Sequence, residues 1–131
     1  HLKITLHPDG GIARFRAYGD FWEEDRDSSF EGINVLSKES GARAIYANDE
    51  HFGCLSNILE KHEPLSMADG WETRRRRGKG SDWLILNSID GSSIDKIEIS
   101  THHFKGNFPS HCSLQAAYLS KKSSKQIVKC T

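Results

Sequence analysis

Residues 69–77 (DGWETRRRR) combine two carboxylates, one tryptophan and four arginines. Side chains alternate along an extended segment, which would put Glu72, Arg74 and Arg76 on one side. A guanidinium forms a two-pronged pair with a substrate carboxylate, and a glutamate beside it accepts protons or holds an amide-like group. A solvated charge run is the simpler interpretation, but Trp71 argues against it, because an aromatic side chain in such a run usually packs on something. We therefore predict a site for an anionic substrate here.

Nucleic-acid binding is the alternative interpretation of this run. The four arginines and Lys79 make a local basic patch, and Trp71 or Trp83 would be available to stack on bases. The whole chain, however, has 18 basic and 18 acidic residues and a formal net charge of +0. Proteins that bind through the phosphate backbone normally spread cations over a face. We therefore expect no nucleic-acid partner.

A second cluster occupies residues 101–109 (THHFKGNFP) and follows a predicted strand. On an extended backbone His103 shares a face with Lys105 and is separated from His102. A histidine that titrates near neutral pH is a candidate general acid or base. Asn107 offers both a donor and an acceptor. The plainer interpretation is a strand end with a surface histidine and a structural turn.

A metal site would need ligands that converge in the fold. His51, Asp69, Glu72 and His103 are the side chains that would have to meet, and their spacing does not show that they do. A divalent cofactor is thus left unknown. No G-x-S-x-G phrase is present, so a covalent serine mechanism is not our first choice.

The composition indicates one ordinary domain of 131 residues, with 36% hydrophobic and 27% charged residues. No apolar run approaches the roughly 20 residues of a membrane span, so we expect no membrane partner. The three cysteines, Cys54, Cys112 and Cys130, are widely spaced. We expect free thiols in a reducing compartment.

Period-two alternation predicts an all-β fold. Residues 2–6 and 12–18 flank the turn signal PDGG and are expected to form a hairpin, with Ala13, Phe15 and Ala17 on one face. Residues 83–89 and 94–99 flank DGSS and are expected to form a second hairpin. The other expected elements are strands over 42–47 and 113–119 and one short helix over 54–61. Short strands with turn signals between them favour a β-sandwich or jelly roll.

The clusters resemble the allantoicase family. The resemblance is carried by these phrases: HLKITLHPDGGIARFRAYG (1–19), NDEHFG (48–53), SMADGWETRRRR (66–77), SDWLIL (81–86) and IDKIEISTHHFKGNFPSHCSLQA (94–116). The resemblance implies tandem repeats of a jelly roll similar to galactose-binding domains. In that layout residues 1–19 are the closing hairpin of a first repeat, 20–34 are a linker, and 35–131 are a second repeat without its closing strands. The chain is thus expected to be an internal piece.

The resemblance also implies hydrolysis of allantoate to ureidoglycolate and urea in purine breakdown. The implied catalytic residues are Glu72, His103 and Asp69. The implied substrate-binding residues are Arg74, Arg75, Asn107, Trp71 and Lys105. The substrate is a small molecule, a homo-oligomer is kept as an option, and the family's usual setting implies an intracellular protein, cytoplasmic or peroxisomal.

Two positions depart from the family's phrases. Ser100 stands where family members often carry an aspartate, and a histidine often stands near Ser81. These changes motivate a second hypothesis, a non-catalytic jelly roll that binds a small ligand.

A jelly roll without its closing strands leaves a sheet edge exposed. Residues 1–19 have a suitable sequence to fill that edge, as a circular permutation would. We therefore predict that they pair next to the strand near 113–119.

Overall fold

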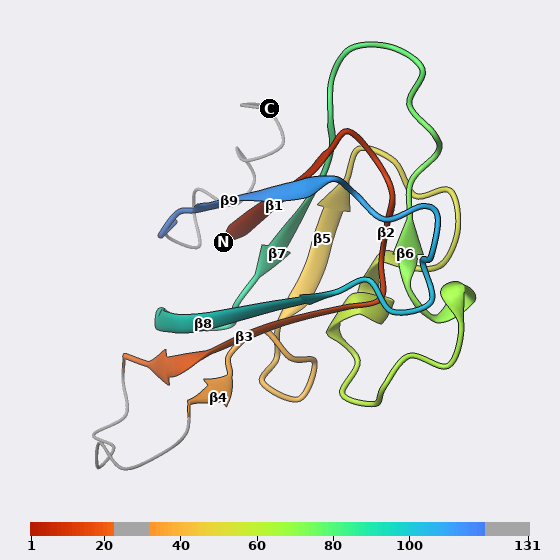
Figure 1. Ribbon diagram of the computed structural model, residues 1–131. Coiled ribbons are helices and arrows are strands. Elements are labelled where there is room, and N and C mark those ends of the chain that lie inside the picture. The colour runs from red at the N-terminus through yellow and green to blue at the C-terminus, as the bar shows by residue number, and fades with distance from the viewer. Residues whose placement is uncertain (23–31, 120–131) are drawn as a thin grey trace.

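The computed structural model describes residues 1–22 and 32–119. Nine strands and two 3₁₀ helices occupy this part of the chain (Figure 1). The strands are β1 (Leu2–His7), β2 (Gly11–Ile12), β3 (Arg14–Phe21), β4 (Ile33–Asn34), β5 (Arg43–Ala47), β6 (Trp71–Glu72), β7 (Asp82–Asn87), β8 (Ser92–Ser100) and β9 (His111–Ala116). The 3₁₀ helices are η1 (Leu55–Leu59) and η2 (Met67–Asp69).

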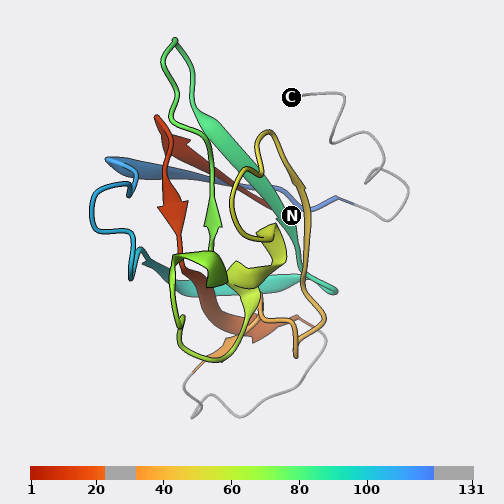
Figure 2. The same ribbon diagram turned by 90° about the vertical axis from the view of Figure 1, so that its right-hand side faces the viewer.

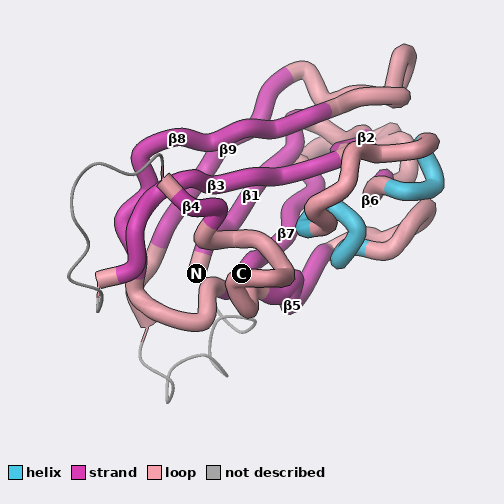
Figure 3. Tube along the Cα trace, turned by 90° about the horizontal axis from the view of Figure 1, so that it is seen from below, coloured by secondary structure: helices cyan, strands magenta, loops and turns pink. Residues whose placement is uncertain are grey.

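Two antiparallel sheets pack face to face. One sheet has the order β5-β7-β1-β9 and the other the order β4-β3-β8, and the short pair β2-β6 lies at one end (Figures 1 and 3). The core lies between the sheets, where alternate residues of β1 and β7 meet Phe15 and Ala17 of β3. This confirms the predicted all-β sandwich. Among the described helices, none is long and apolar enough to cross a membrane.

The first predicted hairpin is wrong. β1 and β3 do not pair with each other, because they lie in opposite sheets. β1 pairs with β7 and β9, whereas β3 pairs with β4 and β8. The chain between them crosses from one sheet to the other through β2. Alternation determines which side of a strand is buried and leaves its partner undetermined, so two strands on one core look like a hairpin in sequence.

The second predicted hairpin is wrong for the same reason. β7 pairs with β1 and β5, and β8 pairs with β3 in the opposite sheet. The DGSS segment is thus a connection across the sandwich.

The predicted pairing of residues 1–19 next to the strand near 113–119 is confirmed for residues 2–7 and is wrong for residues 14–21, which pair with β8 and β4 in the other sheet. β1 pairs with β9 along its length, from Leu2↔Ala116 to His7↔His111. β1 therefore lies inside the sheet, between β7 and β9. Its inward residues Leu2, Ile4 and Leu6 are buried.

The predicted helix is shorter than expected and is a 3₁₀ helix. Leu55, Ile58 and Leu59 are buried, as their spacing predicted. The Glu50 carboxylate accepts a hydrogen bond from the Leu55 N–H at 2.9 Å and holds the first turn. Of the predicted linker, residues 23–31 lie outside the described residues, and Ile33 and Asn34 pair with β3 as β4.

Candidate active site around strand β6

The sequence clusters meet at the short pair β2-β6. Gly11 of β2 pairs with Glu72, and Ile12 pairs with Trp71. On the other side of Glu72, its main chain exchanges hydrogen bonds with Phe52 at 2.9 and 3.1 Å. Figure 2 shows β2 and β6 side by side, with the loop between β8 and β9 next to β2. Segments from four parts of the sequence therefore surround one glutamate.

Glu72 and Asn107 are in direct contact. The Asn107 side-chain amide donates to Glu72 Oε1, and its Nδ2 lies 3.9 Å from the Met67 sulfur. Both side chains are half-buried. Phe52, Met67 and Phe108 are exposed apolar side chains on the same segments. The arrangement presents a carboxylate, oriented by an amide, among apolar groups.

Arg74 is held on the continuation of β6. Its main-chain N–H donates to Asp49 Oδ2 at 2.6 Å, and its Nε donates to His51 Nδ1 at 3.0 Å. Since Nδ1 accepts, neutral His51 carries its proton on Nε2 in this arrangement. The guanidinium is otherwise exposed and suits a carboxylate ligand.

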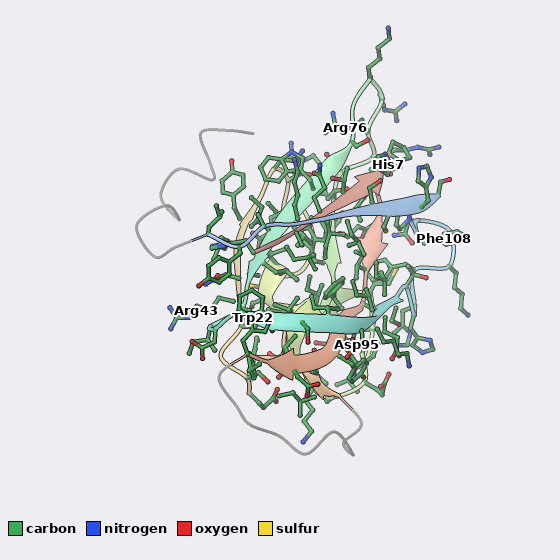
Figure 4. The ribbon with its side chains drawn as sticks, turned by 90° about the vertical axis from the view of Figure 1, so that its left-hand side faces the viewer. His7, Trp22, Arg43, Arg76, Asp95 and Phe108 are labelled. Atoms are coloured by element: carbon green, nitrogen blue, oxygen red, sulfur yellow. The ribbon has the colours of Figure 1, made fainter. Side chains whose placement is uncertain are left out.

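The arginine run lines an open cavity of about 330 Å³. Its lining residues are Asn48, Asp49, Arg74, Arg75, Arg76, Arg77, Gly78 and Asp82. Arg76 has structural partners there: its guanidinium pairs with buried Asp82, and its main-chain N–H donates to Asp9 Oδ2 at 2.6 Å. Figure 4 shows Arg76 and His7 at the same end of the molecule. Arg75 and Arg77 are exposed.

Asp69 forms an ion pair with Arg14, a partner that the sequence analysis did not identify. Arg14 Nη2 lies 2.8 Å from Asp69 Oδ2, and the Arg14 side chain is only 1% exposed. The same carboxylate oxygen accepts from the Leu65 N–H at 3.1 Å and lies 3.2 Å from His62 Nε2. The Arg14 hydrogen bond, as the largest cause, lowers the pKa of Asp69. The structure therefore places Asp69 in a loop-fixing role.

Trp71 lies in the core. It is fully buried, and its indole N–H donates to the Asp49 carbonyl at 3.0 Å. Trp71 was predicted to contact a substrate, whereas the structure places its side chain in the hydrophobic core. Nothing in the local sequence distinguishes these two roles.

His103 lies in the turn that opens the β8–β9 loop. Its backbone is left-handed (φ 73°), and its Nε2 lies 2.8 Å from the Pro64 carbonyl. Its ring meets His102 edge to face at 4.1 Å. Lys105 is exposed two residues further on. His103 thus ties the β8–β9 loop to the segment that leads to Asp69.

The four candidate metal ligands have separate partners. His51 binds Arg74, Asp69 binds Arg14, Glu72 binds Asn107, and His103 binds Pro64. In residues 1–22 and 32–119 no three His, Cys, Asp or Glu side chains are grouped as a metal site. Cys54 and Cys112 are free thiols, and Cys130 lies outside the described residues.

The fold and this site define a β-sandwich that presents charged and amide groups at the end of its two sheets. The family model for the allantoicase repeat matches residues 33–130. The chain belongs to the allantoicase family.

Three relatives illustrate the match. A probable allantoicase of Acinetobacter baumannii (strain ACICU) is 44% identical over 128 residues, which cover 98% of this chain and 38% of that protein. Probable allantoicase 1 of Burkholderia mallei (strain ATCC 23344) is 46% identical over 123 residues, which cover 91% of this chain and 36% of that protein. A probable allantoicase of Pseudomonas fluorescens (strain Pf0-1) is 42% identical over 128 residues, which cover 97% of this chain and 39% of that protein.

The chain spans about two fifths of the length of these relatives. No solved structure matches it.

Proposed function

We propose that the site around β6 binds allantoate and takes part in its hydrolysis to ureidoglycolate and urea. The observation that carries the proposal is the Glu72–Asn107 contact, two residues from the anchored Arg74. Together these groups offer a base and a cation on one short segment, and an amide from the β8–β9 loop that contacts the base. The relatives are named as probable allantoicases, and this substrate fits the three groups.

Arg74 is the proposed binding group for the allantoate carboxylate. Asp49 and His51 hold its main chain and Nε, which fixes the side chain before a ligand arrives. Among the described residues Nη1 and Nη2 of Arg74 make no hydrogen bond, so they remain available for a two-pronged pair. Arg75 and Lys105, both exposed, are the proposed further cations.

Glu72 is the proposed general base. In the net reaction a water oxygen replaces one ureido nitrogen on the carbon that carries both ureido groups: a carbon–oxygen bond forms, one carbon–nitrogen bond breaks, and the departing urea nitrogen takes a proton. Glu72 takes the proton from water, and the Asn107 amide fixes the carboxylate for that step. His103 lies four residues before Asn107 and is the proposed proton donor for the nitrogen. Asp69 contributes indirectly, because Arg14 and Leu65 already bind its carboxylate.

The proposal includes no nucleic-acid partner. Of the four arginines, Arg76 is bound to Asp82. The chain as a whole has a formal net charge of +0, whereas phosphate-backbone binders normally spread cations over a face. We place the activity in the cytoplasm, since the relatives are bacterial proteins and give no support to a peroxisome.

Binding of allantoate tests the carboxylate pair. Titration calorimetry should give heat with allantoate, and Arg74→Gln should weaken binding by about 10- to 100-fold, the loss of a charge-assisted hydrogen bond. Allantoin, the ring-closed compound without the carboxylate, should bind no better to wild type than to the variant. Arg43→Gln, at an exposed arginine of β5, is the matched control and should bind like wild type. Equal affinity of Arg74→Gln and wild type would overturn this role.

A further inference from the structure

Asn107 is fixed at two points on neighbouring strands. Its main-chain carbonyl accepts a hydrogen bond from the Gly11 N–H of β2 at 2.8 Å. Its side-chain amide donates to Glu72 of β6, and Gly11 and Glu72 are directly paired. The position of Asn107 relative to the Glu72 carboxylate is therefore set by how closely the β8–β9 loop approaches the β2-β6 pair.

Phe104 packs where the β8–β9 loop approaches the β2-β6 pair. It is only 1% exposed, although it belongs to a loop whose neighbours Lys105, Gly106 and Phe108 are exposed. Figure 4 shows Phe108 on this loop, between β8 and β9. Phe104 is thus a buried aromatic anchor of the loop, three residues before Asn107, beside the His103–Pro64 contact and the Gly11–Asn107 hydrogen bond.

Two glycines make room for the Phe104 ring. A Cβ at Gly11 would overlap the ring, and a Cβ at Gly70 would lie 3.0 Å from Phe104 Cε2 and 2.7 Å from the Ile12 carbonyl. The ring therefore lies on bare backbone at β2 and at the residue before β6. Gly11 and Gly70 come from the PDGG and DGW phrases, so three separate phrases of the sequence form one packing unit.

We propose that Phe104 is a positioning residue of the site, which holds Asn107 against Glu72 through its packing on Gly11 and Gly70. It does not touch the ligand, and its effect on hydrolysis is transmitted through the Asn107 amide. The inference deepens the proposed function and rests on it for its catalytic part. Its structural part, the link between Phe104 and Asn107, stands by itself.

Phe104→Leu tests the link, since leucine stays apolar and no longer fills the space above the two glycines. Phe15→Leu, at a fully buried phenylalanine of β3, is the matched control for general core loss. In nitrogen–proton NMR spectra, the Asn107 side-chain NH₂ signals should move toward free-amide positions in Phe104→Leu and stay in place in Phe15→Leu. An unmoved Asn107 signal in folded Phe104→Leu, or an equal movement in both variants, would overturn the proposal.

Kinetics separate the inference from the proposed function. Asn107→Ala should lower kcat for allantoate at least 10-fold. Phe104→Leu should lower kcat and change KM by a smaller factor. The double variant should lose no more than Asn107→Ala alone, since both changes remove the same contact. If Asn107→Ala leaves kcat unchanged, the proposed function fails and the NMR result still decides the link. If Asn107→Ala lowers kcat and Phe104→Leu behaves like Phe15→Leu, the positioning role fails.

Discussion

Arg14 of β3 and Asp69 of η2 form an ion pair at 2.8 Å across 55 residues of sequence. Arg14 also donates to the carbonyls of His62, at 2.8 Å, and of Asp69 itself, at 2.6 Å. One buried guanidinium thus holds both ends of the 62–69 loop, which carries Met67 to the site. Loop position and site geometry therefore depend on the same pair.

Asp69→Asn should lower the free energy of unfolding by about 3 kcal/mol, because it leaves a buried guanidinium without its counter-charge. Chemical denaturation at pH 7 measures this. Asp90→Asn, at an exposed aspartate, is the control and should change stability by less than about 0.5 kcal/mol. Equal stability of the two variants would show that the pair contributes nothing.

The same pair predicts a pH dependence. The pKa of Asp69 is lowered in the folded chain, chiefly by Arg14. A carboxyl with a lowered folded pKa stabilises the protein above its unfolded value, about 3.9, and loses this contribution as the pH falls through the folded value. The stability difference between wild type and Asp69→Asn should therefore shrink below about pH 4. A difference that stays constant from pH 7 to pH 2 would contradict the assignment.

Trp71→Phe should lower stability by about 2 kcal/mol through lost packing and the lost bond to the Asp49 carbonyl. Affinity for allantoate should stay the same, because Trp71 is fully buried. Denaturation and calorimetry on the same sample measure both quantities. Trp22→Phe, at a tryptophan 62% exposed, is the control for stability. A 10-fold loss of affinity for allantoate in a stably folded Trp71→Phe variant would show that Trp71 contributes to ligand binding.

Ile4→Ala tests the role of β1 inside the sheet. Ile4 is fully buried between β7 and β9, so its truncation should cost about 3 kcal/mol. Ile45→Ala makes the same chemical change at a residue of edge strand β5 that is 42% exposed, and should cost less than about 1 kcal/mol. Similar losses in both variants would mean that residues 2–7 are not an interior strand in solution.

The positions of the longer strands could be predicted from the sequence, but of their pairings only that of residues 2–7 with β9 was. Alternation in residues 2–6 and 12–18 correctly identified the buried faces. Sheet pairing depends on contacts between distant segments, such as Phe15 with Ile99, that leave no local pattern. Turn signals at PDGG and DGSS therefore look like hairpins although they are crossings between sheets.

The candidate site could likewise be predicted only in part from the sequence. The roles of Glu72, Arg74 and Asn107 stay predictions, although the structure brings Glu72 and Asn107 into contact. Residue chemistry singled these three residues out. Residue chemistry could not show that Asp69 is paired with Arg14 or that Trp71 is fully buried, because both depend on segments that are distant in the sequence. Arg14 was missed because its partner lies 55 residues away.

Urea release from allantoate by the 131-residue chain, compared with its Glu72→Gln variant, tests the proposed function most directly. Glutamine keeps the size of the side chain and cannot take a proton from water. Glu98→Gln, at an exposed glutamate of β8, is the matched control. We predict release by wild type and Glu98→Gln, and a loss of at least about 100-fold in folded Glu72→Gln. Equal rates in Glu72→Gln and wild type, or no release by folded wild type, would contradict the assignment of hydrolysis to this site.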